Sequence, residues 1–122
     1  MMQRQRFDVS TDTGHWTDTG PSFSGAILQM GWSPSTPDTG GDLQITLMPV
    51  PGDTGAGWSI YNNNDCLGSD FLQALRQPQH GSDGAADTGH FAPIAAAGDR
   101  LRVKVTPGGA AVVGKLYVWT VN

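Results

Sequence analysis

The chain has 122 residues, 38% of them hydrophobic, and a formal net charge of −4. This length fits one domain that can bury a core without disulfides, and the acidic balance argues against non-specific binding of nucleic acid, which requires a basic face. Cys66 is the single cysteine, which excludes an internal disulfide and a cysteine-based zinc site.

The charged residues favour an all-β fold. All 11 acidic residues are aspartates, and only two lysines occur, Lys104 and Lys115. Aspartate favours turns, whereas glutamate and lysine are good helix formers. Glycine and proline lie between short apolar runs, as in proteins built from strands and turns. We therefore expect a single antiparallel β-sandwich or jelly-roll of about six to eight strands with an extended N-terminal arm.

The first half of the chain is expected to contain the arm and the first strands. Residues 1–22 are assigned to the arm and residues 23–122 to the sandwich domain. Residues 23–32 form the first expected strand, and residues 43–48 the second. Period-2 alternation predicts that each strand buries one face. The side chains expected on these two faces are Ala26, Leu28, Met30 and Trp32, and then Leu43, Ile45 and Leu47.

The second half is expected to be more varied. Trp58 and Ile60 indicate a strand at 57–61, residues 69–76 could form a helical turn capped by Ser69, and residues 77–89 a long polar loop. A strand then begins near residue 100. The residues expected to point inward from it are Leu101, Val103 and Val105, and those expected to point outward are Arg100, Arg102 and Lys104.

The last strand is predicted to follow a hairpin turn at residues 107–109 and to run to about Val121. It is apolar on both faces, with Leu116, Val118 and Thr120 on one and Tyr117, Trp119 and Val121 on the other. Such a strand is either central in a sheet or covered by a partner.

The tripeptide Asp-Thr-Gly occurs five times, beginning at Asp12, Asp18, Asp38, Asp53 and Asp87. It is the active-site signature of aspartic proteases. Asp53, followed by Thr-Gly-Ala, and the segment 111–115 resemble the two elements of a retropepsin. However, a catalytic aspartate pair must be buried, and the proline-broken residues 49–52 do not provide a buried strand. We expect turns at these positions, and no catalytic residues.

Other candidate sites have simpler interpretations. His15, His80 and His90 are not spaced as zinc ligands, and residues 62–70 lack the pattern of a calcium loop, so we expect no metal and no cofactor. The basic row at 100–104 fits a solvated face that protects a sheet edge, or a docking face for an acidic partner. Core or interface positions are expected for Trp32, Trp58 and Trp119, although the tryptophans also suggest sugar stacking.

Three segments carry a resemblance to a known group of proteins. Residues 98–119 are similar to a terminal hairpin in small structural proteins of tailed bacteriophages, and residues 42–49 and 64–71 look like the same group. The resemblance covers roughly residues 23–122. It implies a capsid decoration or cement protein on the outer surface of the virion, without catalytic residues.

The resemblance also implies partners and a location. Such proteins bind the major capsid protein and assemble with themselves, commonly as trimers. The arm at 1–22, the loop at 77–89 and the last strand would then make the contacts. We expect synthesis in the host cytoplasm without a signal peptide, since residues 1–6 lead into polar sequence, and no binding to nucleic acid or membrane. Two alternatives remain open: a carbohydrate- or receptor-binding head-fibre or tail module, and a retropepsin-like protease.

Overall fold

The computed structural model describes residues 1–11, 14–49, 57–80 and 83–122, except for the side chains of residues 78–80, 86–88 and 90. Its described residues form strands and no helix, so none is long and apolar enough to span a membrane. In chain order the strands are β1 (Met2–Thr11), β2 (Trp16–Thr19), β3 (Phe23–Thr36), β4 (Asp42–Met48), β5 (Trp58–Asn63), β6 (Phe71–Ala74), β7 (Arg76–His80), β8 (Ala86–Thr106) and β9 (Val112–Val121).

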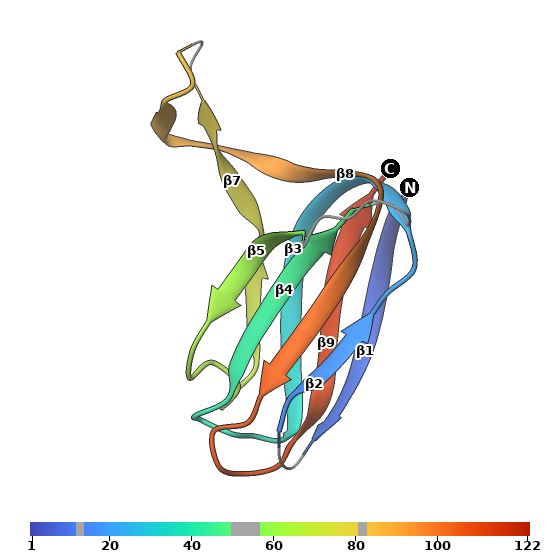
Figure 1. The fold of residues 1–122 in the computed structure, drawn as a ribbon, viewed down its shortest axis with the longest axis vertical. Helices are drawn as coiled ribbons and strands as arrows, with labels where there is room; N and C mark the ends of the chain where they lie inside the picture. Colours follow the sequence, from blue (N-terminus) through green and yellow to red (C-terminus); the bar gives the residue numbers. More distant parts are fainter. Residues whose placement is uncertain (12–13, 50–56, 81–82) are drawn as a thin grey trace.

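The strands form one curled antiparallel sheet that folds over itself into two layers (Figure 1). We call the layer β1-β9-β3-β6 sheet I and the layer β2-β8-β4-β5 sheet II. The long strand β8 joins them, because residues 94–99 pair with β3 while residues 100–106 pair with β4. The expected all-β, sandwich-type fold is confirmed.

The core lies between the two sheets. Alternation in β4 and in the second half of β8 places Leu43, Ile45, Leu101, Val103 and Val105 inward, each at most 1% exposed. These two strands pair directly, from Asp42 opposite Thr106 to Met48 opposite Arg100. The predicted inward faces of these two strands are therefore correct. Burial of apolar surface contributes about 25 cal/mol for each Å², so the burial of these inward side chains is a main source of stability.

Strand β3 departs from the simple alternation expected of it. Ile27, Met30 and Trp32 are buried, whereas Ala26 and Leu28 are only partly buried. The cause is a bulge: Ile27 pairs with Thr120 and Gln29 with Trp119, which leaves Leu28 as an extra residue. An extra residue reverses which side chains point inward, so the predicted face holds for Met30 and Trp32 only.

Residues 1–22, expected as an extended arm, lie largely within the two sheets. Strand β1 pairs with β9 along its whole length, from Met2 opposite Val121 to Thr11 opposite Val112. Phe7 and Val9 are 3% and 1% exposed in the core, and β2 pairs with residues 102–105 of β8. The alternation of Phe7 and Val9 with polar residues therefore belongs to an edge strand, which covers the core with these two side chains.

Two local expectations in the second half are wrong. Residues 69–76 do not form a helical turn: β6 pairs with residues 29–32 of β3, and the Leu75 side chain is buried, 2% exposed. Residues 107–109 are not a hairpin turn either, since β8 pairs with β2, β3, β4 and β7, and β9 with β1 and β3. The turn instead carries the chain from sheet II to sheet I, which makes β9 central.

A two-stranded ribbon replaces most of the polar loop expected at 77–89. Strand β7 pairs with the first half of β8, with Arg76 opposite Pro93 and His80 opposite Ala86. Figure 1 shows this ribbon projecting away from the sandwich, in yellow and orange, while the two chain ends lie together beside the bend of β8. We refer to residues 76–93 as the ribbon. The terminal Met1 nitrogen lies 3.1 Å from the carbonyl oxygen of Asn122 and donates to it.

Candidate binding surfaces

The Asp-Thr-Gly copies do not play equal roles in the structure. The copy at Asp38 forms a turn, in which one carboxylate oxygen accepts from the Gly40 amide at 3.0 Å and the other from the Gly108 amide at 2.7 Å. Asp38 is only 6% exposed. A Cβ on Gly108 would overlap the backbone of Gly40, so only glycine allows this approach. Asp38 therefore clamps two loops at one end of the sandwich.

The other copies are less similar to one another than the sequence suggests. Asp18 lies within β2, where its side chain accepts from the adjacent Thr19 amide at 2.8 Å. Asp87 falls within β8, with Gly89 at φ +85°. Asp12 and Asp53 lie outside the described residues, so the structure does not place the retropepsin-like segment that begins at Asp53.

The described residues do not bring together a metal site or a catalytic cluster. They contain no group of three or more His, Cys, Asp or Glu side chains that could hold a metal ion. The His15 ring lies 3.0 Å from the Thr106 hydroxyl, and the side chains of His80 and His90 are outside the described set. In the oxygen-rich segment 62–70, the Asp65 amide donates to Asp42 at 3.0 Å.

The surroundings of Cys66 disfavour ionisation of its thiol. Burial raises the pKa of its thiol, and the nearby Asp42 carboxylate raises it further, although hydrogen bonding from the Leu43 backbone opposes the shift. Its Sγ lies 3.5 Å from the Asn63 carbonyl oxygen. Because the thiolate is the nucleophile, this environment disfavours catalysis by Cys66 near neutral pH.

We expect Cys66 to react with a disulfide reagent such as DTNB more slowly at pH 7.5 than the cysteine of a short unstructured peptide does. The raised pKa lowers the thiolate fraction, so the deficit should shrink as the pH rises and disappear in denaturant. The measurement is the pseudo-first-order rate from pH 7 to 10. Equal rates for the folded protein and the peptide would show that the site does not suppress ionisation.

The basic row on β8 does not protect a sheet edge. Residues 100–106 lie between β4 on one side and β2 on the other, with Lys104 between Gln44 and Thr17. Arg100, Arg102 and Lys104 are partly buried against these neighbours, so edge protection is the wrong interpretation. An ion pair among the described residues lies elsewhere, between Arg6 and Asp8 on β1 at 3.3 Å.

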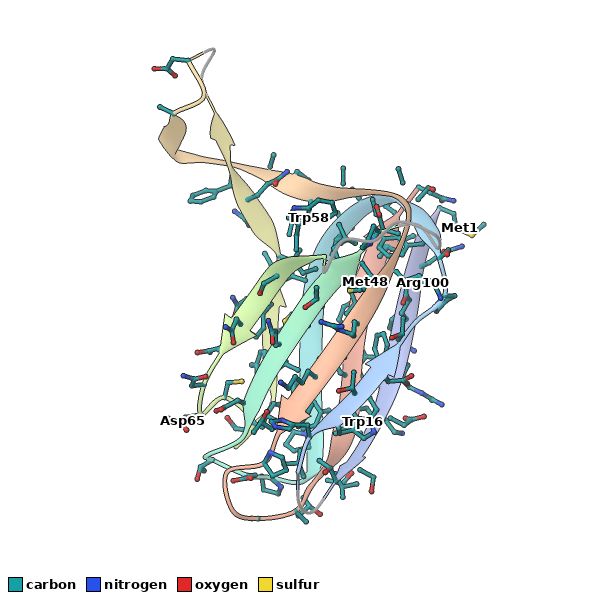
Figure 2. All side chains as sticks on the ribbon, in the orientation of Figure 1. Met1, Trp16, Met48, Trp58, Asp65 and Arg100 are labelled. Atoms are coloured by element: carbon teal, nitrogen blue, oxygen red, sulfur yellow. The ribbon has the colours of Figure 1, made fainter. Side chains whose placement is uncertain are left out.

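A largely apolar cleft of about 680 Å³ lies at the base of the ribbon. Its walls come from β4, β5, β7 and β8 and include Leu47, Trp58, Ile60, Arg76, Ile94 and Asp99. Trp58 is 65% exposed and lies beside the ribbon's base (Figure 2). Trp58 is therefore not a core residue. The other predicted position, at an interface, stays a prediction.

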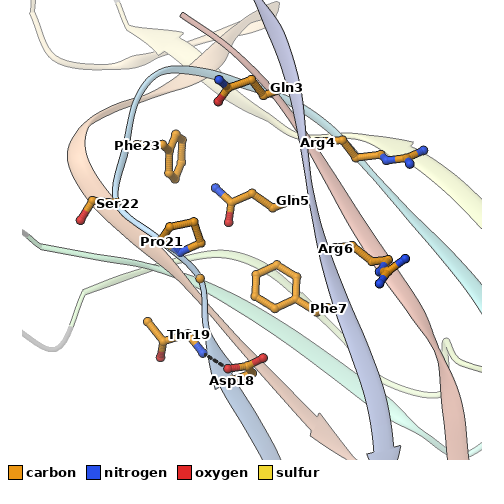
Figure 3. Close-up of a pocket in the computed structure, with 11 residues that line it drawn as sticks. Gln3, Arg4, Gln5, Arg6, Phe7, Asp18, Thr19, Pro21, Ser22 and Phe23 are labelled. Atoms are coloured by element: carbon orange, nitrogen blue, oxygen red, sulfur yellow. Dashed lines mark hydrogen bonds between the residues drawn. The ribbon is translucent and has the colours of Figure 1, made fainter.

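A second cleft, of about 650 Å³, separates β1 from the segment that joins β2 to β3. Figure 3 shows Gln5 pointing into it between Phe7, Pro21 and Phe23. The Gln5 Oε1 atom is buried without a hydrogen-bond partner in the described part of the chain. A Cβ on Gly20 would overlap that oxygen, so the glycine makes room for the amide. This cleft marks the side of the sandwich where β1 and β2 face each other without pairing.

The outer face of sheet I combines aromatic and basic side chains. The Tyr117 and Trp119 rings on β9 lie 5.9 Å apart at 38° to each other. The Arg4 guanidinium lies 4.7 Å from the centre of the Tyr117 ring. Leu72 on β6 is 64% exposed. The sequence correctly predicted a last strand that is apolar on both faces; it is central, and its outer face is still partly open to solvent.

Sequence reasoning missed the exposed apolar side chains that flank these surfaces. Phe91, on the ribbon, is 55% exposed and Met2 63%. The sequence around Phe91 does not predict a strand with an exposed apolar side chain, because Ala92 and Pro93 do not alternate with polar residues. For the face on sheet I, the available signal was the outward pair Tyr117 and Trp119, two positions apart on a strand.

Comparison with known proteins yields only distant likenesses. No protein-family model matches the sequence, and no curated protein matches it. The fold is similar to part of a chain in the structure of infectious bursal disease virus, Gt strain, with a TM-score of 0.45 and 15% identity. A chain from the Gx strain gives 0.38 and 14%. Both alignments cover 98% of this chain and 32% of the other, so this chain spans about a third of their length.

Proposed function

We propose that the protein is a non-enzymatic structural protein of a virion, and that it acts as a capsid decoration or cement protein. In this proposal it lies on the outer surface of the shell and bridges subunits of the major capsid protein. It also assembles with further copies of itself as a homotrimer. No cofactor takes part. The sequence resemblance to phage structural proteins supports the virion role, and the geometry of the ribbon supports assembly.

The projecting ribbon is the observation that carries the proposal. Two strands without a third are marginally stable in water at best, and none of the described side chains of the ribbon belongs to the buried core. It nevertheless presents Phe91, 55% exposed, beyond the body of the sandwich. Aromatic side chains of this kind are enriched at the centres of protein interfaces. A ribbon that reaches a neighbouring subunit would gain there the apolar contacts that it lacks on its own.

The remaining described surfaces are consistent with a binding role rather than a catalytic one. The cleft at the ribbon's base exposes Trp58 next to Arg76, so the ribbon and its base offer one continuous contact region. A partner that binds only the folded protein stabilises it by mass action. A small sandwich held between capsid subunits would therefore be more stable on the shell than free in solution.

The Phe91→Ser variant is expected to weaken binding to shells at least tenfold, since truncation of a central interface aromatic commonly costs 2 kcal/mol or more, about thirtyfold. Folding should be almost unchanged, because the side chain is already 55% exposed. The measurement is cosedimentation of purified protein with shells prepared from an infection in which this gene is deleted. The matched control is Met2→Ser, another exposed apolar residue, 63% exposed and on β1, outside the ribbon.

The Met2→Ser control should bind as the wild type does. Absence of the protein from purified particles, together with no binding of the wild type to deleted shells, would overturn the virion role. Normal binding by Phe91→Ser would instead remove the ribbon from the contact.

A further inference from the structure

A shallow, open depression lies on the outer face of sheet I at Gly31. Its floor is Gly31 on β3, one wall is Leu72 on β6, and the other wall is formed by Tyr117 and Trp119 on β9. The volume is about 340 Å³, and Ser33 and Asp70 lie at its rim. We call this feature the aromatic slot. It lies outside the ribbon and shares no lining residue with the cleft at the ribbon's base or with the cleft beside β1.

Strand register produces the slot. Gly31 pairs with Tyr117 on one side and with Leu72 on the other, so the three residues form one outward-facing row. Because glycine has no side chain, the middle of this row leaves room for the side chains of its neighbours. A Cβ placed on Gly31 would lie 3.1 Å from the six-membered ring of Trp119 and 3.3 Å from Leu72. The ring therefore leans over the glycine, and the glycine sets the depth of the slot.

The two rings of the aromatic wall pack against neighbouring side chains in the ligand-free structure. Tyr117 is held between the Trp119 ring, 5.9 Å away, and the Arg4 guanidinium, 4.7 Å from its ring centre. A cation over an aromatic face is attracted by the ring's electron density. Two positioned rings on a central strand are a rigid surface, so little conformational entropy is lost on binding.

The polar groups around the slot argue against a purely apolar occupant. Within the described part of the chain, Ser33, Asp70 and the Tyr117 hydroxyl make no side-chain hydrogen bond. An apolar side chain seated in the slot would leave these groups without water or partner, at a cost of about 1–3 kcal/mol each if they were fully buried. A ligand with hydroxyl groups around an apolar ring face would instead satisfy them.

The charges around the slot argue against nucleic acid. Arg4 is engaged with Tyr117, and Arg6 is paired with Asp8. Lys115 adds one positive charge on this face and Asp70 one negative charge at the rim. Binding of single-stranded nucleic acid combines stacking with a clearly basic groove, and this nearly balanced set does not provide one.

We propose that the aromatic slot binds a pyranose ring of a neutral glycan. The C–H face of the sugar packs on Trp119, because pyranose C–H groups meet the negative face of an aromatic ring favourably, and Tyr117 offers its hydroxyl beside it. The Asp70 carboxylate accepts hydrogen bonds from sugar hydroxyls, and Ser33 can donate or accept. The volume of about 340 Å³ is at the lower end of the range for small-molecule sites. This activity is independent of the ribbon.

The test uses the whole chain and a fixed panel of soluble oligosaccharides: maltotriose, cellotriose, lactose, chitotriose and sialyllactose. Saturation-transfer NMR identifies binders, and titration of tryptophan fluorescence gives the Kd. We expect at least one neutral member to bind with a Kd of about 1 mM or tighter, equivalent to about −4 kcal/mol. Trp119→Ala should weaken that binding at least tenfold, and Asp70→Asn severalfold.

Two controls keep the proposal falsifiable. Trp58→Ala removes another exposed tryptophan, 65% exposed and outside the slot, and should leave the Kd unchanged. Asp70→Asn alters an exposed rim residue, so it tests the slot without disturbing the fold even if Trp119→Ala proves unstable. The proposal is overturned if no neutral sugar of the panel binds, if binding survives Trp119→Ala and Asp70→Asn alike, or if only sialyllactose binds. Loss of sugar binding would leave the shell-binding proposal intact.

Discussion

Replacement of Trp32 by alanine is expected to lower the free energy of unfolding by about 3–5 kcal/mol, the usual cost of removing a buried large aromatic. Trp32 is 2% exposed, and its indole nitrogen donates to the Leu67 carbonyl at 3.3 Å. The ring rests on Gly114, where a Cβ would come within 2.6 Å of it. The truncated side chain would therefore leave both a cavity and an unpaired carbonyl.

Equilibrium denaturation in urea measures this loss through the midpoint and slope of the transition. The matched control is Trp58→Ala, because that side chain is 65% exposed and exposed substitutions usually change stability by less than about 0.5 kcal/mol. Similar losses for the two variants would mean that Trp32 is not at the centre of the core.

The second large effect is expected at Asp38, where alanine should cost about 2–4 kcal/mol. The carboxylate accepts from the Gly40 and Gly108 amides at 3.0 and 2.7 Å, and hydrogen bonds to charged groups contribute about 1.5–3 kcal/mol each. Removing the side chain also leaves two amides unpaired, one in each of two loops that connect the sheets. Urea denaturation again provides the measurement.

Asp18→Ala is the matched control, since it alters the same tripeptide at an exposed position whose carboxylate bonds only the next amide, at 2.8 Å. It should change stability by no more than about 0.5 kcal/mol. If both aspartates cost the same, the copy at Asp38 is not a structural clamp and the five copies would have to be considered equivalent.

The parts of the fold that could be predicted are those with long apolar alternation. Strands β4 and β9 and the second half of β8 were found because alternate residues, such as Leu43 and Ile45, share one buried face. Strand β1 was missed because only Phe7 and Val9 carry that signal among charged neighbours. The bulge at Leu28 could not be predicted either, since it depends on the pairing of β3 with β9.

The binding surfaces were less predictable than the core. The sequence indicated that the last strand is apolar on both faces, which identified Tyr117 and Trp119. It could not show that Gly31 and Leu72 lie beside them, because register between β9, β3 and β6 brings these residues together from three parts of the chain. The ribbon was hidden for a different reason: backbone pairing, rather than apolar periodicity, defines it.

The most direct test of the structural role is the position of the protein in native particles. Particles purified from the producing infection are cross-linked, digested and analysed by mass spectrometry, and the mass of the free protein is measured by light scattering. We predict cross-links from ribbon residues to the major capsid protein or to another copy of this chain. We also predict that the protein free in solution has a mass of two or more times 12.9 kDa. A free monomer that is absent from the particles would contradict the proposed function.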